Sequence, residues 1–199
     1  MNKMSTAAKI LDRIIAVIFW ITLAVSAICV IAIGILAILS FSIPGRSAWP
    51  LTTLTFGSLE LTLHPDAVPG NYGIYLLATI LLMLLHVPVF CIMLRTLRDT
   101  LKPFIACQPF HDTISLNLRK LAMLVVVQMV LGILGEAVLT GLIVSLFDPA
   151  SLLRNDMVLN VSVNATADLT PLLFAGALYL LSKVFLYGQE LQQLADETL

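Results

Sequence analysis

Residues 121–147 read LAMLVVVQMVLGILGEAVLTGLIVSLF, and Glu136 is the only ionisable side chain among them. About 20 apolar residues, rising about 1.5 Å each, cross a hydrocarbon core of roughly 30 Å. The stretch therefore predicts a membrane-spanning helix with one acid near its middle. Gln128, Gly132, Glu136 and Thr140 are spaced four residues apart, so they lie along one face of that helix. A polar face inside a bilayer is expected to contact protein rather than lipid.

The composition of the whole chain is that of a membrane protein. Of its 199 residues, 59% are hydrophobic and 12% are charged, whereas about a quarter of residues are charged in soluble proteins. We therefore expect a single integral membrane domain over residues 1–199. The formal net charge of −1 argues against nucleic acid as a partner, because binding phosphates requires a clustered basic surface.

Chemistry-bearing motifs are missing from the sequence. It has no His/Cys cluster with metal-ligand spacing, no glycine-rich phosphate loop and no serine nucleophile elbow. The expectation is that the protein is not an enzyme and binds no metal or cofactor.

Three further apolar stretches predict three more membrane helices. The first has no charge from Ile14 to Phe41, which is too long for the apolar core of a cleaved signal peptide. The second contains Pro88, which frees a backbone carbonyl that protein must satisfy, so we expect the adjacent His86 to face protein. Asp112 is expected to cap the helix that contains residues 121–147, which is the third along the chain. The predicted layout is helices at about 14–41, 74–97, 113–147 and 169–187, outer loops 42–73 and 148–168, a cytoplasmic loop 98–112 and a cytoplasmic tail 188–199.

The two outer loops contain a different pattern. Apolar and polar residues alternate between Leu51 and Leu63, around a Gly57-Ser58 pair suited to a two-residue turn, and again from Met157 to Val163. A period of two is typical of strands, and a third strand can pair with a hairpin. The predicted fold class is thus an all-α membrane protein with four transmembrane helices and a small extracytoplasmic β-sheet.

The distribution of basic residues predicts the orientation. Nine of the 11 lie in segments on the side of both termini, and Arg46 and Arg154 lie on the other. Because cytoplasmic segments carry the excess of Lys and Arg, both termini and the middle loop are expected in the cytoplasm. The nine residues are Lys3, Lys9, Arg13, Arg95, Arg98, Lys102, Arg119, Lys120 and Lys183.

Two groups of short motifs resemble a bacterial membrane family known as domain of unknown function 2975. The first group is Gln108-Pro109-Phe110 followed by Asn117-Leu118-Arg119-Lys120-Leu121-Ala122. The second is Val184-Phe185, Gly188, Glu190-Leu191 and the terminal Asp196-Glu197-Thr198-Leu199. The resemblance implies a four-helix bacterial inner-membrane protein, often encoded beside a small helix-turn-helix regulator. It implies no known activity.

These motifs fall on the predicted cytoplasmic side and suggest a contact surface there. Acids of the tail, Asp196 and Glu197, are positioned to meet the basic residues Arg95, Arg98, Arg119 or Lys120. Such exposed ion pairs contribute about 0 to 1 kcal/mol each. The surface is interpreted either as a docking site or as the closed end of the helices. Its candidate residues are Phe110, Arg119, Phe185, Glu190 and Asp196.

A buried polar site is predicted around Glu136. His86 lies 12 residues below Ile74 and Glu136 lies 11 residues from Phe147, which gives depths of roughly 18 and 16 Å below the outer surface. We therefore expect the two side chains to meet, with Ser26 and Tyr179 as alternative partners. The site would either set the register of the helices or hold a proton or ligand. Its candidate residues are Glu136, His86, Gln128, Thr140, Ser26 and Tyr179.

The expected function follows from these features. We expect a non-enzymatic bacterial inner-membrane protein that acts through protein–protein contacts, in an envelope-response or immunity-type role. The alternative is a small proton- or ion-coupled transporter or channel that uses Glu136 and His86, although transporters usually have more helices or an internal repeat. The expected partners are the lipid bilayer and another membrane or cytoplasmic protein, with the oligomeric state left open.

Overall fold

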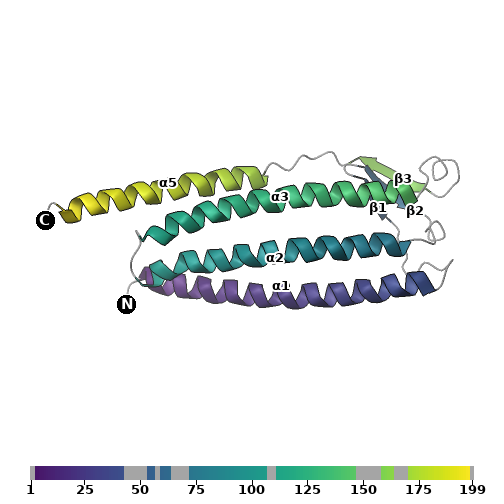
Figure 1. The fold of residues 1–199 in the computed structure, drawn as a ribbon, viewed down its shortest axis with the longest axis horizontal. Coiled ribbons are helices and arrows are strands. Elements are labelled where there is room, and N and C mark those ends of the chain that lie inside the picture. Colours follow the sequence, from purple (N-terminus) through teal and green to yellow (C-terminus); the bar gives the residue numbers. More distant parts are fainter. Residues whose placement is uncertain are drawn as a thin grey trace. The chain divides into compact units, whose positions relative to one another are not determined.

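Four long helices dominate the part of the chain that the structure, a computed structural model, describes (Figure 1). They are α1 (Lys3–Ser42), α2 (Tyr72–Ile105), α3 (Asp112–Leu146) and α5 (Thr170–Glu197). The described residues are 3–42, 53–56, 59–63, 72–106, 111–146, 158–163 and 170–197. Each of the four helices contains a segment long and apolar enough to cross a membrane. The prediction of four helices long and apolar enough to cross a membrane is therefore confirmed, as expected for a multi-pass membrane protein.

The helices extend beyond the apolar runs that predicted them. α1 begins at Lys3 rather than near residue 14, and α2 continues to Ile105 through residues assigned to the cytoplasmic loop. α5 continues past Gly188 to Glu197, so most of the expected tail is a continuation of the fourth helix. Once a helix has formed, each added residue gains one backbone hydrogen bond whatever its polarity. The apolar run therefore marks the part suited to lipid and not the end of the helix.

The start of α3 corrects the predicted cap. His111 precedes the helix, and its Nδ1 accepts a 3.3 Å hydrogen bond from the backbone N–H of Thr113. Its carbonyl accepts another, of 2.9 Å, from the N–H of Ile114. A cap is the non-helical residue before the first turn, so His111 takes this role instead of Asp112. Asp112 is the first helical residue, where its negative charge is favoured by the helix dipole.

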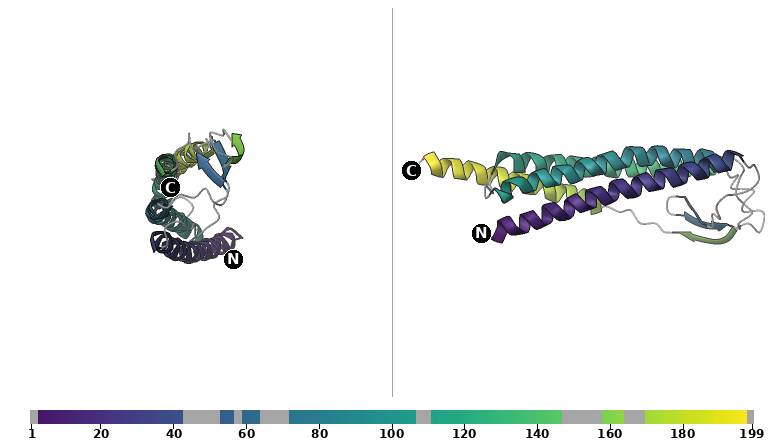
Figure 2. Two further views of the ribbon diagram at one scale, coloured as in Figure 1. Left: turned by 90° about the vertical axis from the view of Figure 1, so that its right-hand side faces the viewer. Right: turned by 90° about the horizontal axis from the view of Figure 1, so that it is seen from below.

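Three short strands form one antiparallel sheet with the order β1-β2-β3 (Figure 2). β1 (Thr53–Phe56) pairs with β2 (Leu59–Leu63), with Phe56 opposite Leu59. β2 pairs with β3 (Val158–Val163), and the register shifts between Thr62 and Leu63. The strands lie within the two segments whose alternation predicts strands. The predicted Gly57-Ser58 turn lies outside the described residues.

The chain divides into two compact units, where the sequence predicts one domain. The first unit comprises residues 1–25, 86–130 and 168–199, and the second comprises residues 26–85 and 131–167. Helices α1, α2 and α3 each contribute a segment to both units. α5 belongs entirely to the first unit, whereas the sheet belongs to the second.

The best-buried side chains of the described residues lie mostly in the first unit. α3 supplies five apolar ones, which fall within about 100° around the helix as expected for one face, and Ile114 among them is completely buried. In the second unit, Ala37 of α1 is the one described apolar side chain that is buried to this degree. The buried apolar residues of the first unit are Ala8, Ile15, Leu94, Ile114, Leu118, Leu121, Ala122, Val125 and Ala175.

Candidate functional site

Glu136 lies on the face of α3 that forms the core of the first unit. It follows Leu118 by 18 residues, which is five turns of a helix with 3.6 residues per turn. It follows Val125 by 11 residues, close to three turns. Leu118 and Val125 are only 6% and 8% exposed. One helix face thus contacts protein in the first unit and carries the acid in the second.

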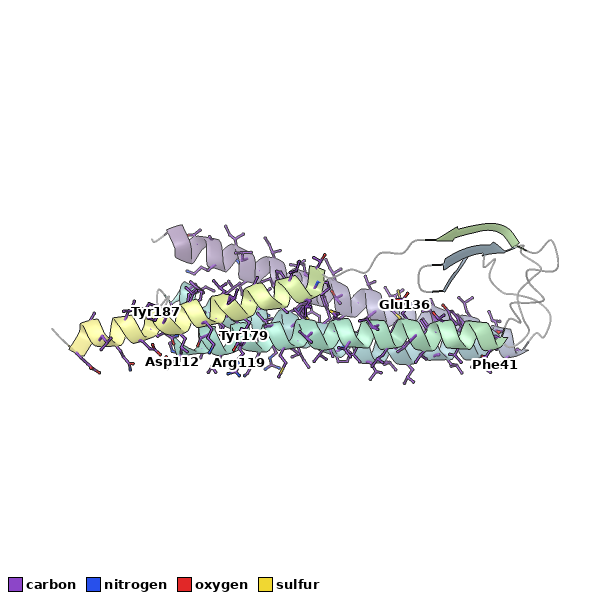
Figure 3. All side chains as sticks on the ribbon, turned by 90° about the horizontal axis from the view of Figure 1, so that it is seen from above. Phe41, Asp112, Arg119, Glu136, Tyr179 and Tyr187 are labelled. Atoms are coloured by element: carbon purple, nitrogen blue, oxygen red, sulfur yellow. The ribbon has the colours of Figure 1, made fainter. Side chains whose placement is uncertain are left out.

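The structure leaves Glu136 exposed on α3 (Figure 3). This corrects the expectation that the chain itself buries the acid. The second unit contains segments of α1, α2 and α3, but α5 begins at Thr170 and lies wholly in the first unit. Among the described residues, the second unit therefore contains segments of three helices only, and α5 is not among them.

The surroundings of Glu136 are apolar and open. Ile133, Leu134 and Val138 are exposed by 57%, 56% and 51%. Gly132 precedes the acid by one turn, and a Cβ added there would meet no atom within 4 Å. Among the described residues, Glu136 makes no hydrogen bond or ion pair. The acid stands on a helix face that a neighbouring helix could approach closely.

The other residues predicted for the polar site are divided between the two units. Thr140 and Ser26, like Glu136, belong to the second unit, and both are half-buried. His86, Gln128 and Tyr179 belong to the first unit. The meeting of Glu136 with His86 joins two separate units and therefore stays a prediction.

Two residues of this group in the first unit have local surroundings of their own. The Oε1 atom of Gln128 is buried and accepts no hydrogen bond from the described residues. The Tyr179 side chain is exposed, and the ammonium of Lys183 lies 5.7 Å from the centre of its ring. This distance is within the range of a cation–π contact. Tyr179 therefore contacts a residue of its own helix, one turn further along.

An ion pair links α1 to α2 in the first unit. Arg98 Nε donates to Asp12 Oδ1 at 2.8 Å, and a second guanidinium nitrogen lies 3.4 Å from Asp12 Oδ2. The residue pattern predicts Arg98 in a loop facing the tail and does not point to Asp12. Asp12 is the only acid before Glu60, and it lies among basic residues. An isolated acid in a basic segment was the sequence feature that could have indicated an ion pair at Asp12.

The last helix is attached to α2 and α3 by contacts within the first unit. The rings of Phe104 and Phe185 meet edge to face with their centres 6.0 Å apart. The buried hydroxyl of Ser182 donates a 2.9 Å hydrogen bond to the carbonyl of Ser115. Phe185, predicted as part of a contact surface, therefore packs against its own chain. Nothing in the sequence pattern pointed to the two serines.

The remaining residues of the predicted cytoplasmic contact surface are either exposed or not among the residues that the structure describes. Arg119 (Figure 3) and Glu190 are exposed and form no ion pair with the described residues. Phe110 and the side chain of Asp196 lie outside the described residues. Arg98, expected to meet the tail, pairs with Asp12 of α1 among the described residues.

Among the described residues, no three His, Cys, Asp or Glu side chains gather closely enough to hold a metal ion. In comparisons with protein-family models, curated proteins and solved structures, nothing matches this chain. The resemblance to the domain of unknown function 2975 family therefore rests on its two groups of motifs.

Proposed function

We propose that this chain is a non-enzymatic bacterial inner-membrane protein that acts by contacting another protein within the membrane, in an envelope-response or immunity-type role. The observation that carries this proposal is the exposure of Glu136 on a helix face that contacts protein elsewhere along α3. A membrane partner that covered this face would complete, in the second unit, the packing that α3 has in the first.

The energetics of the bilayer favour such a partner. A charged carboxylate at the middle of a membrane helix costs about 2.5–3.5 kcal/mol on scales derived from insertion experiments. Protonation removes the charge but still leaves a hydroxyl and a carbonyl without hydrogen bonds in hydrocarbon. A protein partner that supplied a donor or acceptor would remove this cost. Contact with lipid alone would leave these polar groups without hydrogen bonds.

The proposed orientation has both termini in the cytoplasm and the sheet outside. Its support is the positive-inside rule, since nine of the 11 basic residues belong to the first unit. The resemblance to the domain of unknown function 2975 family supports the same four-helix layout. The three-stranded sheet would then present a small surface on the extracytoplasmic side.

Photo-crosslinking in living cells tests the proposal. A photoreactive phenylalanine analogue at Ile133 lies about 60° around the helix from Glu136, whereas one at Leu134 lies about 160° away. The two native side chains are equally exposed, at 57% and 56%. The expected result is a protein adduct from position 133, identified by mass spectrometry, and lipid adducts from position 134. Lipid adducts alone at both positions would contradict the proposal.

The alternative function, a small proton- or ion-coupled carrier or channel, rests on the same exposed acid together with His86. It predicts proton flux when the purified full chain is placed in liposomes, and loss of that flux in Glu136→Gln. Under the proposed contact function, the wild-type chain shows no flux above that of empty liposomes. The two functions are thus separated by one measurement.

A further inference from the structure

We infer that the α3 face around Gly132 and Glu136 joins two copies of this chain. The inference rests on the proposed contact function and names the partner. Three observations lead to it: the shape of the face, the chemistry of the acid, and the continuity of this face with the buried stripe of α3.

The shape of the face suits another helix. Gly132 and Glu136 are four residues apart, so they lie about 40° apart around α3. A Cβ at Gly132 would meet nothing within 4 Å, so the backbone there is open to close approach. Glycine at such a position lets two membrane helices pack with their backbones near one another. The exposed Ile133 adds apolar contact at the edge of this face.

The chemistry of the acid points to a second copy. A protonated carboxyl group has one donor and one acceptor, so two such groups can satisfy each other with a reciprocal pair of hydrogen bonds. In a twofold dimer the same patch of both chains meets, and an axis that passes beside Glu136 brings Glu136 to Glu136. Because Glu136 is the only ionisable residue in 121–147, no other charge on this stretch opposes the pairing.

The face continues a stripe of α3 that is buried in the first unit. Its first-unit part, which includes Leu118 and Val125, is buried, and its second-unit part is exposed at Glu136. A second α3 would cover the exposed part with the same residues that it offers.

Cysteine crosslinking of the full chain in membranes tests the inference. The three native cysteines are replaced by alanine, and Ile133→Cys is compared with Leu134→Cys. The native residues at these positions have matched exposure but lie on different sides of α3. A short bifunctional thiol reagent is expected to yield several times more dimer from Ile133→Cys. Equal yields from the two positions, or none from either, would overturn the inference.

Variants of the acid test the hydrogen-bonded pair. Self-association is measured in liposomes by energy transfer between labelled copies diluted with increasing lipid. Glu136→Gln keeps a donor and an acceptor and is expected to associate within a few-fold of wild type. Glu136→Leu is expected to associate roughly five- to thirty-fold more weakly, which corresponds to the 1–2 kcal/mol measured for interhelical hydrogen bonds in model peptides. If Glu136→Leu does not accumulate in the membrane, the cysteine pair above, which retains Glu136, still decides the result.

The outcomes separate this inference from the proposed function. Adducts at position 133 with the same chain, together with the cysteine result, support both. Adducts with a different protein and a monomeric chain in liposomes overturn the dimer but leave the contact function standing. Adducts with lipid alone overturn both.

Discussion

The hydroxyl of Ser182 in α5 donates a 2.9 Å hydrogen bond to the backbone carbonyl of Ser115 in α3, and both residues are buried. In a helix interior that carbonyl also accepts the N–H four residues further on. The serine therefore adds a second bond to a group that is already satisfied. It attaches the last helix to α3 at a point where both side chains are buried.

Ser182→Ala is expected to lower the free energy of unfolding by about 0.5–1.5 kcal/mol, the usual net contribution of one hydrogen bond. The value should fall toward the lower end, because the Ser115 carbonyl keeps its helical partner. Thermal unfolding in detergent measures the change. Ser145→Ala is the matched control, since the exposed Ser145 hydroxyl donates to the carbonyl of Leu142 in its own helix. Equal destabilisation by both variants would show that the contact between helices adds nothing.

The ion pair of Asp12 and Arg98 is expected to contribute little to stability. The side chains are 26% and 39% exposed, and partly exposed pairs usually contribute between about 0.2 and 1 kcal/mol. A double-mutant cycle with Asp12→Asn and Arg98→Gln should give a coupling energy in this range, decreasing as salt screens the charges. The pair of Asp99 and Lys102, within α2 and more exposed, is the control and should couple more weakly. A coupling energy well above 1 kcal/mol would mean that water is excluded from the Asp12 pair.

Gly73 and Phe41 are expected to depend on each other. A Cβ at Gly73 would lie 2.6 Å from Phe41 Cε2, so Gly73→Ala displaces the ring. Phe41 is 55% exposed, so its ring has room to turn away and the net change should be small. In a Phe41→Ala background, Gly73→Ala should instead stabilise by about 0.4–1 kcal/mol, through reduced freedom of the unfolded chain. Additive effects of the two changes, measured by thermal unfolding, would exclude the contact.

The proposed orientation can be tested with reporter fusions. Alkaline phosphatase is active only outside the cytoplasm, so a fusion after Asp66 should be active and one after Leu199 inactive. A fusion after Ala106, beyond the end of α2, should also be inactive, because the positive-inside rule places that segment in the cytoplasm. Activity after Leu199 but not after Asp66 would reverse the orientation.

Local composition was sufficient to predict the helices. A run of about 20 apolar residues is stable as a helix in lipid almost regardless of its neighbours, because only internal hydrogen bonds satisfy its backbone. The four membrane helices, including the stretch around Glu136, could therefore be predicted one at a time. The pattern that predicts the strands is equally local, because the alternation of apolar and polar residues is visible within a few positions.

The ends of the helices were not predictable in the same way. The apolar run of α1 begins near residue 14 and that of α5 ends near Tyr187. The helices nevertheless extend to Lys3 and to Glu197. Polar residues continue a helix as well as apolar ones do, so the apolar boundary says little about the structural one. The cap of α3 at His111 likewise depends on one backbone geometry that the pattern of residue types does not reveal.

The sequence by itself determined that Glu136 would lie on one face of a membrane helix with Gly132. Only the tertiary structure decided what that face meets, because burial depends on which helix segments share a unit. The bonds between elements, Asp12 with Arg98 and Ser182 with Ser115, join residues 86 and 67 positions apart. The same face of α3 is buried at Leu118, in the first unit, and exposed at Glu136, in the second. Helix formation depends on neighbours along the chain, whereas the environment of a side chain depends on neighbours in space.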